Sequence, residues 1–397
     1  MRPYRLPPAG SPLPPSEVLR SFFRAMRNGR GEKAPLAGSF KDYLRVGHVL
    51  FVSSGTAALW LILKGILRLR PGKGEVIIPA YTCPAVAAAV LRAGLKPVLC
   101  DIELDNFGLD PEELKRKVNA RTLAVVVVHL LGYPNEMKGV KEICQERGIF
   151  LIEDAAQAFG NFFDSGERIG TVGDAGFFSF GRGKPLSLNH GGAITTNRSD
   201  LFVAMLQIYN EMEEPTALEG LSLFGTLLIY SLFFTPYLYW IPSSLPFLKL
   251  GETIFKPHFP TKKMNPLLMA LVRSRLSGLQ KEREMREEKV AFYLEELSSV
   301  RGVRVPARPY PFLRFPLLVL PSKRDRILEA LKGKGTGAAL FYPCPLNEQP
   351  GLREVLKDPG PYPGAKELSQ SLITLPLHPR VSFRMMRETV KVIRERL

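Results

Sequence analysis

The chain has 397 residues, 45% of them hydrophobic, and its 54 Lys and Arg against 38 Asp and Glu give a formal net charge of +16. This length and apolar content allow a sizeable core and two domains, and they exclude a small module held together by disulfides. The positive charge favours an anionic partner, but it does not choose among a nucleotide, a lipid headgroup and a nucleic acid, and nothing else supports nucleic-acid binding.

The cysteines and histidines are scattered along the chain. There is no CxxC pair, which favours a reduced intracellular protein, and the five histidines show no zinc-ligand spacing, so we predict no metal site. The amino terminus is rich in proline and has no apolar core, so it does not resemble a signal peptide, and we expect a cytoplasmic protein. The four cysteines are Cys83, Cys100, Cys144 and Cys344.

Strands and helices alternate through the first half of the chain. After an extended arm (1–15), an amphipathic helix is expected over 16–28. Buried strands follow at 49–54, 75–80, 96–102, 123–131, 150–154, 175–181 and 192–196. Helical stretches between them predict an α/β domain whose seven-stranded, mostly parallel sheet is covered by helices.

Two of these strands end in residues that suggest a cofactor site. The run Phe177–Phe180 stops at Gly181-Arg182-Gly183, flexible backbone that presents Lys184, and the strand Phe150–Asp154 ends in an acid. A lysine and an acid at the ends of buried strands suit pyridoxal phosphate (PLP), which needs a lysine amine and a carboxylate that keeps the pyridine nitrogen protonated. Taken singly, Lys184 is an ordinary loop lysine and Asp154 a cap, but together they favour the cofactor site.

The strand 49–54 turns through Gly55 and Thr56 into a helix. Free backbone N–H groups at the positive end of that helix, with hydroxyls beside them, make a phosphate site, although an ordinary helix cap explains the same residues. Neither a P-loop nor a G-x-S-x-G elbow fits, because phenylalanines stand where their first glycines belong. His129 and His190 lie near the predicted site and receive no catalytic role.

A family resemblance rests on eight short motifs. Together with their order, they resemble the DegT-type sugar aminotransferases, enzymes of PLP fold type I that aminate keto groups on nucleotide-linked sugars. The combination of EDAAQ with FSF-x-x-x-K is the specific part. The motifs are SSGTAAL (53–59), IPAYT (78–82), DI-x-x-D (101–105), VHLLGYP (128–134), EDAAQAFG (153–160), GDAGFFSF-x-x-x-K (173–184), GGAITTN (191–197) and FYPCPL (341–346).

The resemblance implies a role for individual residues. Lys184 would be the Schiff-base lysine and proton shuttle, Asp154 would face the pyridine nitrogen, and Gln157 would lie on the side of the phenolic oxygen. The phosphate would be held by Gly55, Thr56 and Ser179.

Two positions depart from the family pattern. The family often places a ring-stacking aromatic where this chain has Cys83, so Tyr81 or another aromatic would have to cover the cofactor. An asparagine that reaches the partner subunit's phosphate is replaced by the stretch 259–264, where Thr261 or a lysine would have to serve.

The implied function is an aminotransferase that takes an amino group from a donor such as glutamate and gives it to a keto-sugar on a nucleotide. The implied assembly is a homodimer with shared active sites. Two alternatives stay open. One is a PLP enzyme that acts on a lipid-linked or non-sugar ketone at a membrane surface, and the other is a non-catalytic regulatory descendant of the fold.

An apolar insert (215–260) separates the large domain (1–214) from a small α+β domain (261–397). Residues 220–248 carry no charge. A spanning helix would put the domains on opposite sides of a membrane, so we consider either shallow contact with one leaflet, with Tyr237, Tyr239 and Trp240 at the interface, or helices packed on the protein. In the small domain we expect one long helix (265–297), strands at 302–305, 313–320 and 338–342, and helices at 323–334 and 385–397.

Overall fold

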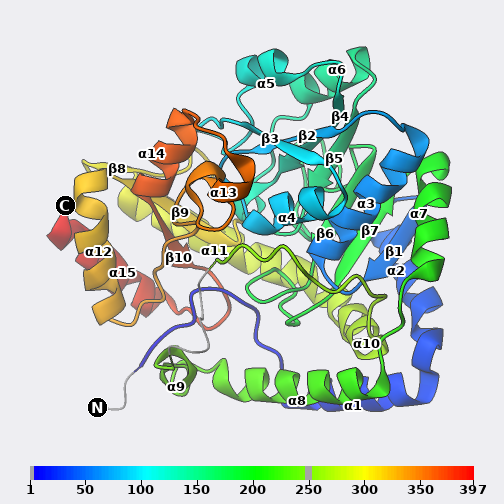
Figure 1. Cartoon of the computed structure of the whole chain (residues 1–397). Helices are drawn as coiled ribbons and strands as arrows, with labels where there is room; N and C mark the ends of the chain where they lie inside the picture. The colour runs from blue at the N-terminus through cyan, green and yellow to red at the C-terminus, as the bar shows by residue number, and fades with distance from the viewer. Residues whose placement is uncertain (1–3, 246–252) are drawn as a thin grey trace.

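The computed structural model describes residues 4–245 and 253–397. The large domain is built on a mixed seven-stranded sheet in the order β1-β7-β6-β5-β4-β2-β3 (Figure 1). The five strands from β6 to β3 are parallel, whereas β7 and β1 run antiparallel to their neighbours. This confirms the predicted mostly parallel sheet. The strands are β1 (His48–Val52), β2 (Glu75–Pro79), β3 (Lys96–Cys100), β4 (Thr122–Val128), β5 (Phe150–Asp154), β6 (Ala175–Ser179) and β7 (Gly192–Thr196).

Helices cover both faces of the sheet. All seven residues of β4 are buried, which explains its unbroken apolar run, because a strand covered on both faces does not alternate. One face packs on α5 (Pro111–Lys117) and α6 (Lys138–Glu146). The other packs on the helices α3 (Gly55–Leu69), α4 (Pro84–Arg92) and α7 (Ser199–Glu211).

The small domain contains an antiparallel sheet in the order β10-β9-β8. The expected strand at 338–342 is wrong, because Ala339 makes only an isolated bridge to Thr374, and Pro343 and Pro345 cannot donate to a ladder. The elements are β8 (Val303–Arg304), β9 (Arg314–Val319), β10 (Leu372–Pro376), α12 (Pro321–Gly333), α13 (Arg353–Leu356), α14 (Pro363–Ser371) and α15 (Phe383–Arg396).

The expected long helix at 265–297 is two helices. A 3₁₀ turn, Leu276–Gly278, separates α10 (Pro266–Arg275) from α11 (Leu279–Leu297). Ser277 and Gly278 are weak helix formers, which accounts for the break at this point.

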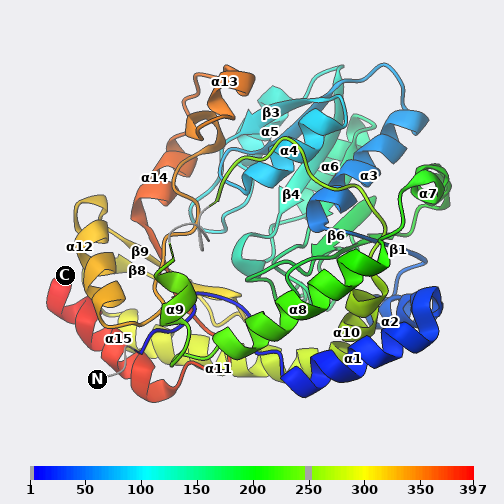
Figure 2. The same ribbon diagram turned by 60° about the horizontal axis from the view of Figure 1, so that its bottom comes forward.

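The insert folds as helices packed on the protein. A capping box between Thr216 and Glu219 starts α8 (Ala217–Phe233), and the short α9 (Trp240–Ser243) follows. Figures 1 and 2 show α8 lying beside α1 (Pro15–Asn28), which in turn packs on α10. The helix α2 (Lys33–Leu44) then leads into β1. Within the described ranges, no helix combines the length and the apolar character needed to cross a bilayer. The last residues of the uncharged run 220–248 lie outside the described residues.

The amino-terminal arm ties the insert to the small domain. Arg5 N donates to the Pro236 carbonyl at 3.0 Å, and Tyr230 Oη donates to the Ser11 carbonyl at 3.2 Å. On its other side, the arm accepts a hydrogen bond at the Pro7 carbonyl from His378 Nε2 at 2.8 Å. Residues 4–14 therefore form the predicted extended arm, wedged between the insert and the small domain.

Candidate active site

A tight turn after β6 presents Lys184. Gly183 has φ of 74°, a conformation that favours glycine, and Lys184 N donates back to the Gly181 carbonyl at 3.3 Å. The side chain of Lys184 is half-buried. The turn thus places an amine beside the edge where the parallel strands end.

Asp154 is the last residue of β5 and is 6% exposed. Its Oδ1 accepts a hydrogen bond from Ala156 N at 3.0 Å. Burial raises the pKa of Asp154 above its usual value, and the positive charge of Lys184 partly offsets this rise. Among residues 4–245 and 253–397, no cation forms an ion pair with Asp154, so the site holds a buried carboxyl group that a protonated ring nitrogen would complement.

The start of α3 is the place where the sequence predicts a phosphate site. Ser54 caps the helix, its Oγ accepting from Ala57 N at 3.1 Å, so Gly55 and Thr56 occupy the first turn. Ser179 packs so closely on the helix terminus that a Cβ added to Gly55 would stand 2.9 Å from Ser179 Cβ, so only glycine fits at position 55. The Ser179 hydroxyl therefore lies against the amino-terminal end of α3, whose first turn contains Thr56.

Gln157 links the two domains. Its Oε1 accepts from Leu131 N at 2.9 Å, and its Nε2 donates to the hydroxyl of Tyr342 at 3.3 Å. Burial raises the pKa of Tyr342 well above its usual value, and the acidic groups of Cys83 and Asp154 add to this rise. Tyr342 belongs to the motif FYPCPL (341–346), and no role was predicted for this tyrosine.

Tyr81 is held by the backbone of Tyr342. Its hydroxyl donates to the Tyr342 carbonyl at 3.0 Å and accepts from the Tyr342 amide at 3.1 Å, and the two rings lie 5.5 Å apart. Cys83 is half-buried, and burial raises the pKa of its thiol while the charge of Lys184 lowers it. Cys83 thus lies near Lys184 and Asp154, whereas the Tyr81 hydroxyl is hydrogen-bonded to the small domain.

Arg314 is a buried cation near Tyr81 and Tyr342 to which the sequence assigned no role. It is 7% exposed at the start of β9, and its Nη2 reaches the Thr374 carbonyl at 3.4 Å. Its buried Nε has no hydrogen-bond partner among the residues that the structure describes. Burial lowers the pKa of Arg314 to about 10, and the nearby Tyr239 and Tyr81 act against that shift. The signal was an arginine inside the apolar run FLRFPLLVL.

His129 has the structural role expected of it. It is fully buried, its Nε2 donates to Glu153 Oε2 at 3.1 Å, and its Nδ1 accepts from Asn135 N at 3.2 Å. Because both ring nitrogens are hydrogen-bonded, neither is available for proton transfer. His129 instead holds the backbone next to Asp154 in place.

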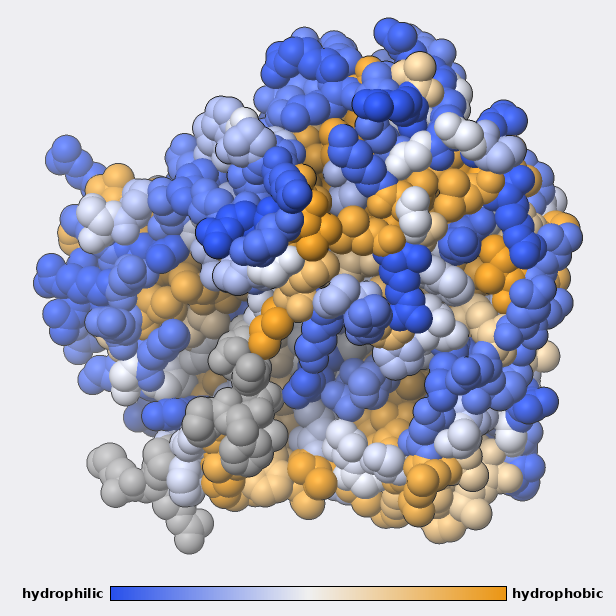
Figure 3. Space-filling view, viewed as in Figure 1, coloured by the Kyte–Doolittle hydropathy of each residue, from blue (hydrophilic) through white to orange (hydrophobic). Residues whose placement is uncertain are grey.

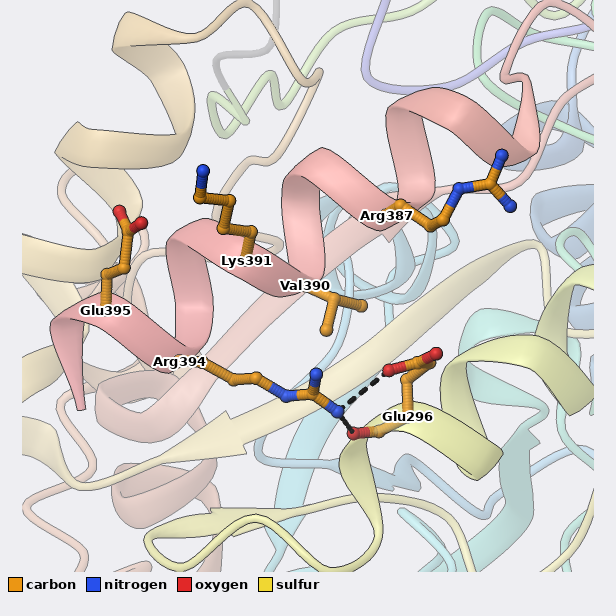
Figure 4. Close-up of a pocket in the computed structure, with 6 residues that line it drawn as sticks. All are labelled: Glu296, Arg387, Val390, Lys391, Arg394 and Glu395. Carbon is orange, nitrogen blue, oxygen red and sulfur yellow. Dashed lines mark hydrogen bonds and ion pairs between the residues drawn. The ribbon is translucent and has the colours of Figure 1, made fainter.

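A hollow of about 430 Å³ lies away from these residues, between α11 and α15 on the small domain (Figure 4). Arg394 Nη2 donates across it to both the carbonyl and Oε2 of Glu296, each at 2.8 Å. The side chains that line it are mostly charged and open to solvent, so we assign it no part in the chemistry.

The fold and the site define a class of protein. Three features fit the aldehyde, ring nitrogen and phosphate of PLP: an amine on a glycine turn, a buried carboxyl group that forms no ion pair within 4–245 and 253–397, and a helix amino terminus beside the Ser179 hydroxyl. These features, together with the mixed sheet and the small domain, are the features of a PLP-dependent aminotransferase of fold type I.

The chain belongs to the DegT/DnrJ/EryC1/StrS aminotransferase family, whose model matches residues 18–215 and 260–395. It is 27% identical over 387 residues to the dTDP-3-amino-3,4,6-trideoxy-alpha-D-glucose transaminase of Streptomyces venezuelae, covering 96% of this chain and 92% of that protein. It is 28% identical over 357 residues to the erythromycin biosynthesis sensory transduction protein EryC1 of Saccharopolyspora erythraea, covering 88% and 86%.

Solved structures share the fold. The S. venezuelae DesV structure, in complex with a ketimine intermediate, superposes with a TM-score of 0.77 at 25% identity over 96% of this chain and 94% of DesV. Helicobacter pylori PseC, an aminotransferase involved in pseudaminic acid biosynthesis, gives 0.79 at 19% identity over 98% of both chains. The family match leaves out 216–259, the stretch that forms α8 and α9 here.

Proposed function

We propose that this protein moves an amino group from glutamate to a keto group of a sugar carried on a nucleotide, with PLP as its cofactor. The observations that carry the proposal are the closeness of Lys184 to Asp154, at the end of the strand beside β6, and the contact of Ser179, at the end of β6, with Gly55 at the start of α3. The family membership and relatives named for dTDP- and UDP-sugar substrates support the acceptor class.

Each part of the site has a task. When bound, PLP supplies an aldehyde that reacts with amines and a ring that takes up electrons from the donor carbon. Lys184 Nζ would hold the aldehyde carbon between turnovers and carry the proton between the cofactor and the substrate carbon. Asp154 would keep the ring nitrogen protonated, and Gln157 would face the phenolic oxygen. The helix start with Gly55, Thr56 and Ser179 would hold the phosphate.

Arg314 supports an anionic donor. A guanidinium that is buried without a carboxylate loses hydration that a ligand carboxylate would replace. Its neighbours Tyr81 and Tyr342 connect it to Gln157 and so to the cofactor site. We propose that Arg314 binds a carboxylate of the amino donor.

We also propose a homodimer with shared active sites, as the family resemblance implies. Within the stretch that would reach the partner, Lys262 pairs with Glu219 at 2.9 Å and Lys263 with Glu214 at 2.9 Å. Thr261 has no side-chain hydrogen bond among the described residues, and we propose it as the intersubunit contact.

The function is tested on the full chain reconstituted with PLP. We expect borohydride to fix the cofactor onto the peptide that carries Lys184, and glutamate to be converted to 2-oxoglutarate in a half-reaction. Lys184→Ala should bind the cofactor without being labelled and should show no half-reaction. A wild-type protein that neither binds PLP nor converts glutamate would contradict the proposal.

The second candidate is a PLP enzyme whose acceptor is lipid-linked or not a sugar. It is favoured by the uncharged insert, which lies outside the family match and whose Tyr239 lies near Arg182 beside Lys184. Product analysis with soluble nucleotide keto-sugars and with lipid-linked keto-sugars separates the two candidates. An absent half-reaction would instead favour the regulatory alternative, in keeping with the names of two relatives.

A further inference from the structure

The helices α1 and α8 together form an apolar outer surface, which we call the α1–α8 face. The two helices lie side by side along one side of the molecule (Figures 1 and 2). Phe22 of α1 stacks on Phe224 of α8 with ring centroids 4.1 Å apart. Figure 3 shows apolar side chains along that lower edge. The exposed apolar residues of the face are Leu19, Phe23 and Met26 on α1, Leu218, Leu221, Ile229 and Leu232 on α8, and Tyr237 and Leu238 beyond it.

These exposures are large for side chains of this kind. Phe23 is 64% exposed, Leu218 76% and Ile229 60%. Their spacing on each helix, such as 19, 23 and 26 on α1, keeps them on one stripe that points away from the core. A contiguous stripe of this kind on two adjacent helices marks a surface that meets an apolar partner.

The charge on the face has one sign. Arg20 and Arg27 lie beside the apolar stripe of α1, are exposed, and form no ion pair among the described residues. The acids at the helix starts are already paired, Glu17 with Arg275 at 3.2 Å and Glu219 with Lys262 at 2.9 Å. After Glu219, α8 carries no charged residue.

We propose that the α1–α8 face docks on the surface of a membrane that contains anionic phospholipid. Apolar side chains would enter the boundary between headgroups and acyl chains, while Arg20 and Arg27 stay at the level of the phosphates. The net charge of +16 adds a long-range attraction to such a surface. A second copy of this chain suits the face less well, because a twofold contact would bring these arginines together without an acid between them.

A hollow at the end of the face suits the same partner. It encloses about 370 Å³ between the arm, the turn after α8 and the small domain. The rings of Tyr4 and Tyr237 meet edge to face there at 5.2 Å, and Arg380 is the cation in its lining. Tyrosines are favoured at the interface between headgroups and water, and the guanidinium would receive a headgroup phosphate.

Vesicle binding tests the proposal with the full chain loaded with cofactor. We expect the protein to sediment with vesicles of phosphatidylcholine and phosphatidylglycerol but not with pure phosphatidylcholine, and to be released as salt is raised. Arg20→Ala with Arg27→Ala should weaken binding roughly 25-fold, since each basic side chain at an anionic surface contributes about fivefold. Arg116→Ala with Arg147→Ala removes two exposed arginines from α5 and the turn after α6, on the opposite side, and should leave binding unchanged.

The apolar part has its own variants. Phe23→Ser with Ile229→Ser should abolish vesicle binding, whereas Leu320→Ser with Val355→Ser, which changes two residues of similar exposure elsewhere, should leave it unchanged. Circular dichroism and the melting temperature show whether each variant folds. The proposal is overturned if the wild type ignores anionic vesicles, or if the Phe23 and Ile229 changes alter only the oligomer mass in sedimentation, which would assign the face to a second copy.

Discussion

Gln157 Nε2 of the large domain lies 3.3 Å from the hydroxyl of Tyr342, which the small domain supplies. The same Tyr342 holds Tyr81 through two backbone hydrogen bonds, so one small-domain residue contacts two residues that the sequence assigned to the cofactor. The position of the small domain is therefore coupled to the shape of the site.

Tyr342→Phe should test this coupling. Losing the hydroxyl leaves Gln157 Nε2 without its partner and should lower the free energy of unfolding by about 1 kcal/mol. It should also weaken PLP binding, because Gln157 is then free to turn. Urea unfolding and a cofactor titration measure the two effects.

The matched control is Tyr310→Phe, which removes a 2.7 Å hydrogen bond to the Phe162 carbonyl. It should cost a similar free energy of unfolding and leave the affinity for PLP unchanged. Equal losses of affinity in both variants would mean that Tyr342 acts only on stability.

Asp154→Asn should change the stability of the cofactor-free protein and its response to PLP in opposite directions. Burial raises the pKa of Asp154, so the folded protein without cofactor binds a proton more tightly than the unfolded chain, and stability falls as pH rises above the ordinary value of 3.8. The asparagine avoids this loss and can keep the hydrogen bond from Ala156 N.

Unfolding by urea measures the difference across pH. Without PLP, the Asp154→Asn protein should be more stable than the wild type at neutral pH, and the gap should narrow as the pH approaches 3.8. With PLP present, the wild type should gain more stability than the variant. A cofactor-free variant less stable than the wild type would show that Asp154 already has a cationic partner.

The large domain was predictable in detail because its strands follow one another along the chain. Asp154 ends β5 and Lys184 lies in the turn that follows the adjacent parallel strand β6, and the carboxyl ends of adjacent parallel strands meet at one edge, so local pattern alone brings the two residues to the same edge. The insert was harder, because its uncharged run fits a lipid surface and a packed helix equally well. Only the contacts of α8 with α1 and the arm show that it packs on the protein.

Tyr342 and Arg314 could not have been assigned in the same way. Tyr342 lies 185 residues along the chain from Gln157, and Arg314 is near Tyr81, which also belongs to the large domain. No local pattern specifies how a small domain is placed against a large one. The arginine in the run FLRFPLLVL was the visible anomaly, since a lone charge in a buried strand needs a reason.

Arg314→Gln should raise the KM for glutamate by roughly 10- to 150-fold, the equivalent of about 1.5–3 kcal/mol for a hydrogen bond to a charged group. The borohydride label on Lys184 should persist, because Arg314 is not assigned to the cofactor. Arg314→Lys should recover part of the loss, since it restores the charge without the planar fork. An unchanged KM in the glutamate half-reaction would exclude Arg314 from donor binding.

His378 should make the attachment of the arm sensitive to acid. It is 5% exposed, its Nε2 donates to the Pro7 carbonyl, and burial lowers its pKa to about 4. The charged groups that act on its ring are Lys289, Arg380 and Arg314, and all three oppose its protonation. The unfolded chain takes up this proton near pH 6.5, whereas the folded chain takes it up only near pH 4. The contribution of His378 to the free energy of unfolding is therefore complete above pH 6.5, and the protein loses up to about 3 kcal/mol of stability as the pH falls from 6.5 to 4.

His378→Gln can keep a donor toward Pro7 but does not titrate. Its free energy of unfolding should therefore depend less on pH than that of the wild type between about 6.5 and 4, and protease cleavage within residues 4–14 should rise with acid only in the wild type. His48→Gln is the control, because His48 is more exposed and stacks on Phe202 far from the arm. Identical pH profiles for the wild type and His378→Gln would place the acid sensitivity in other groups.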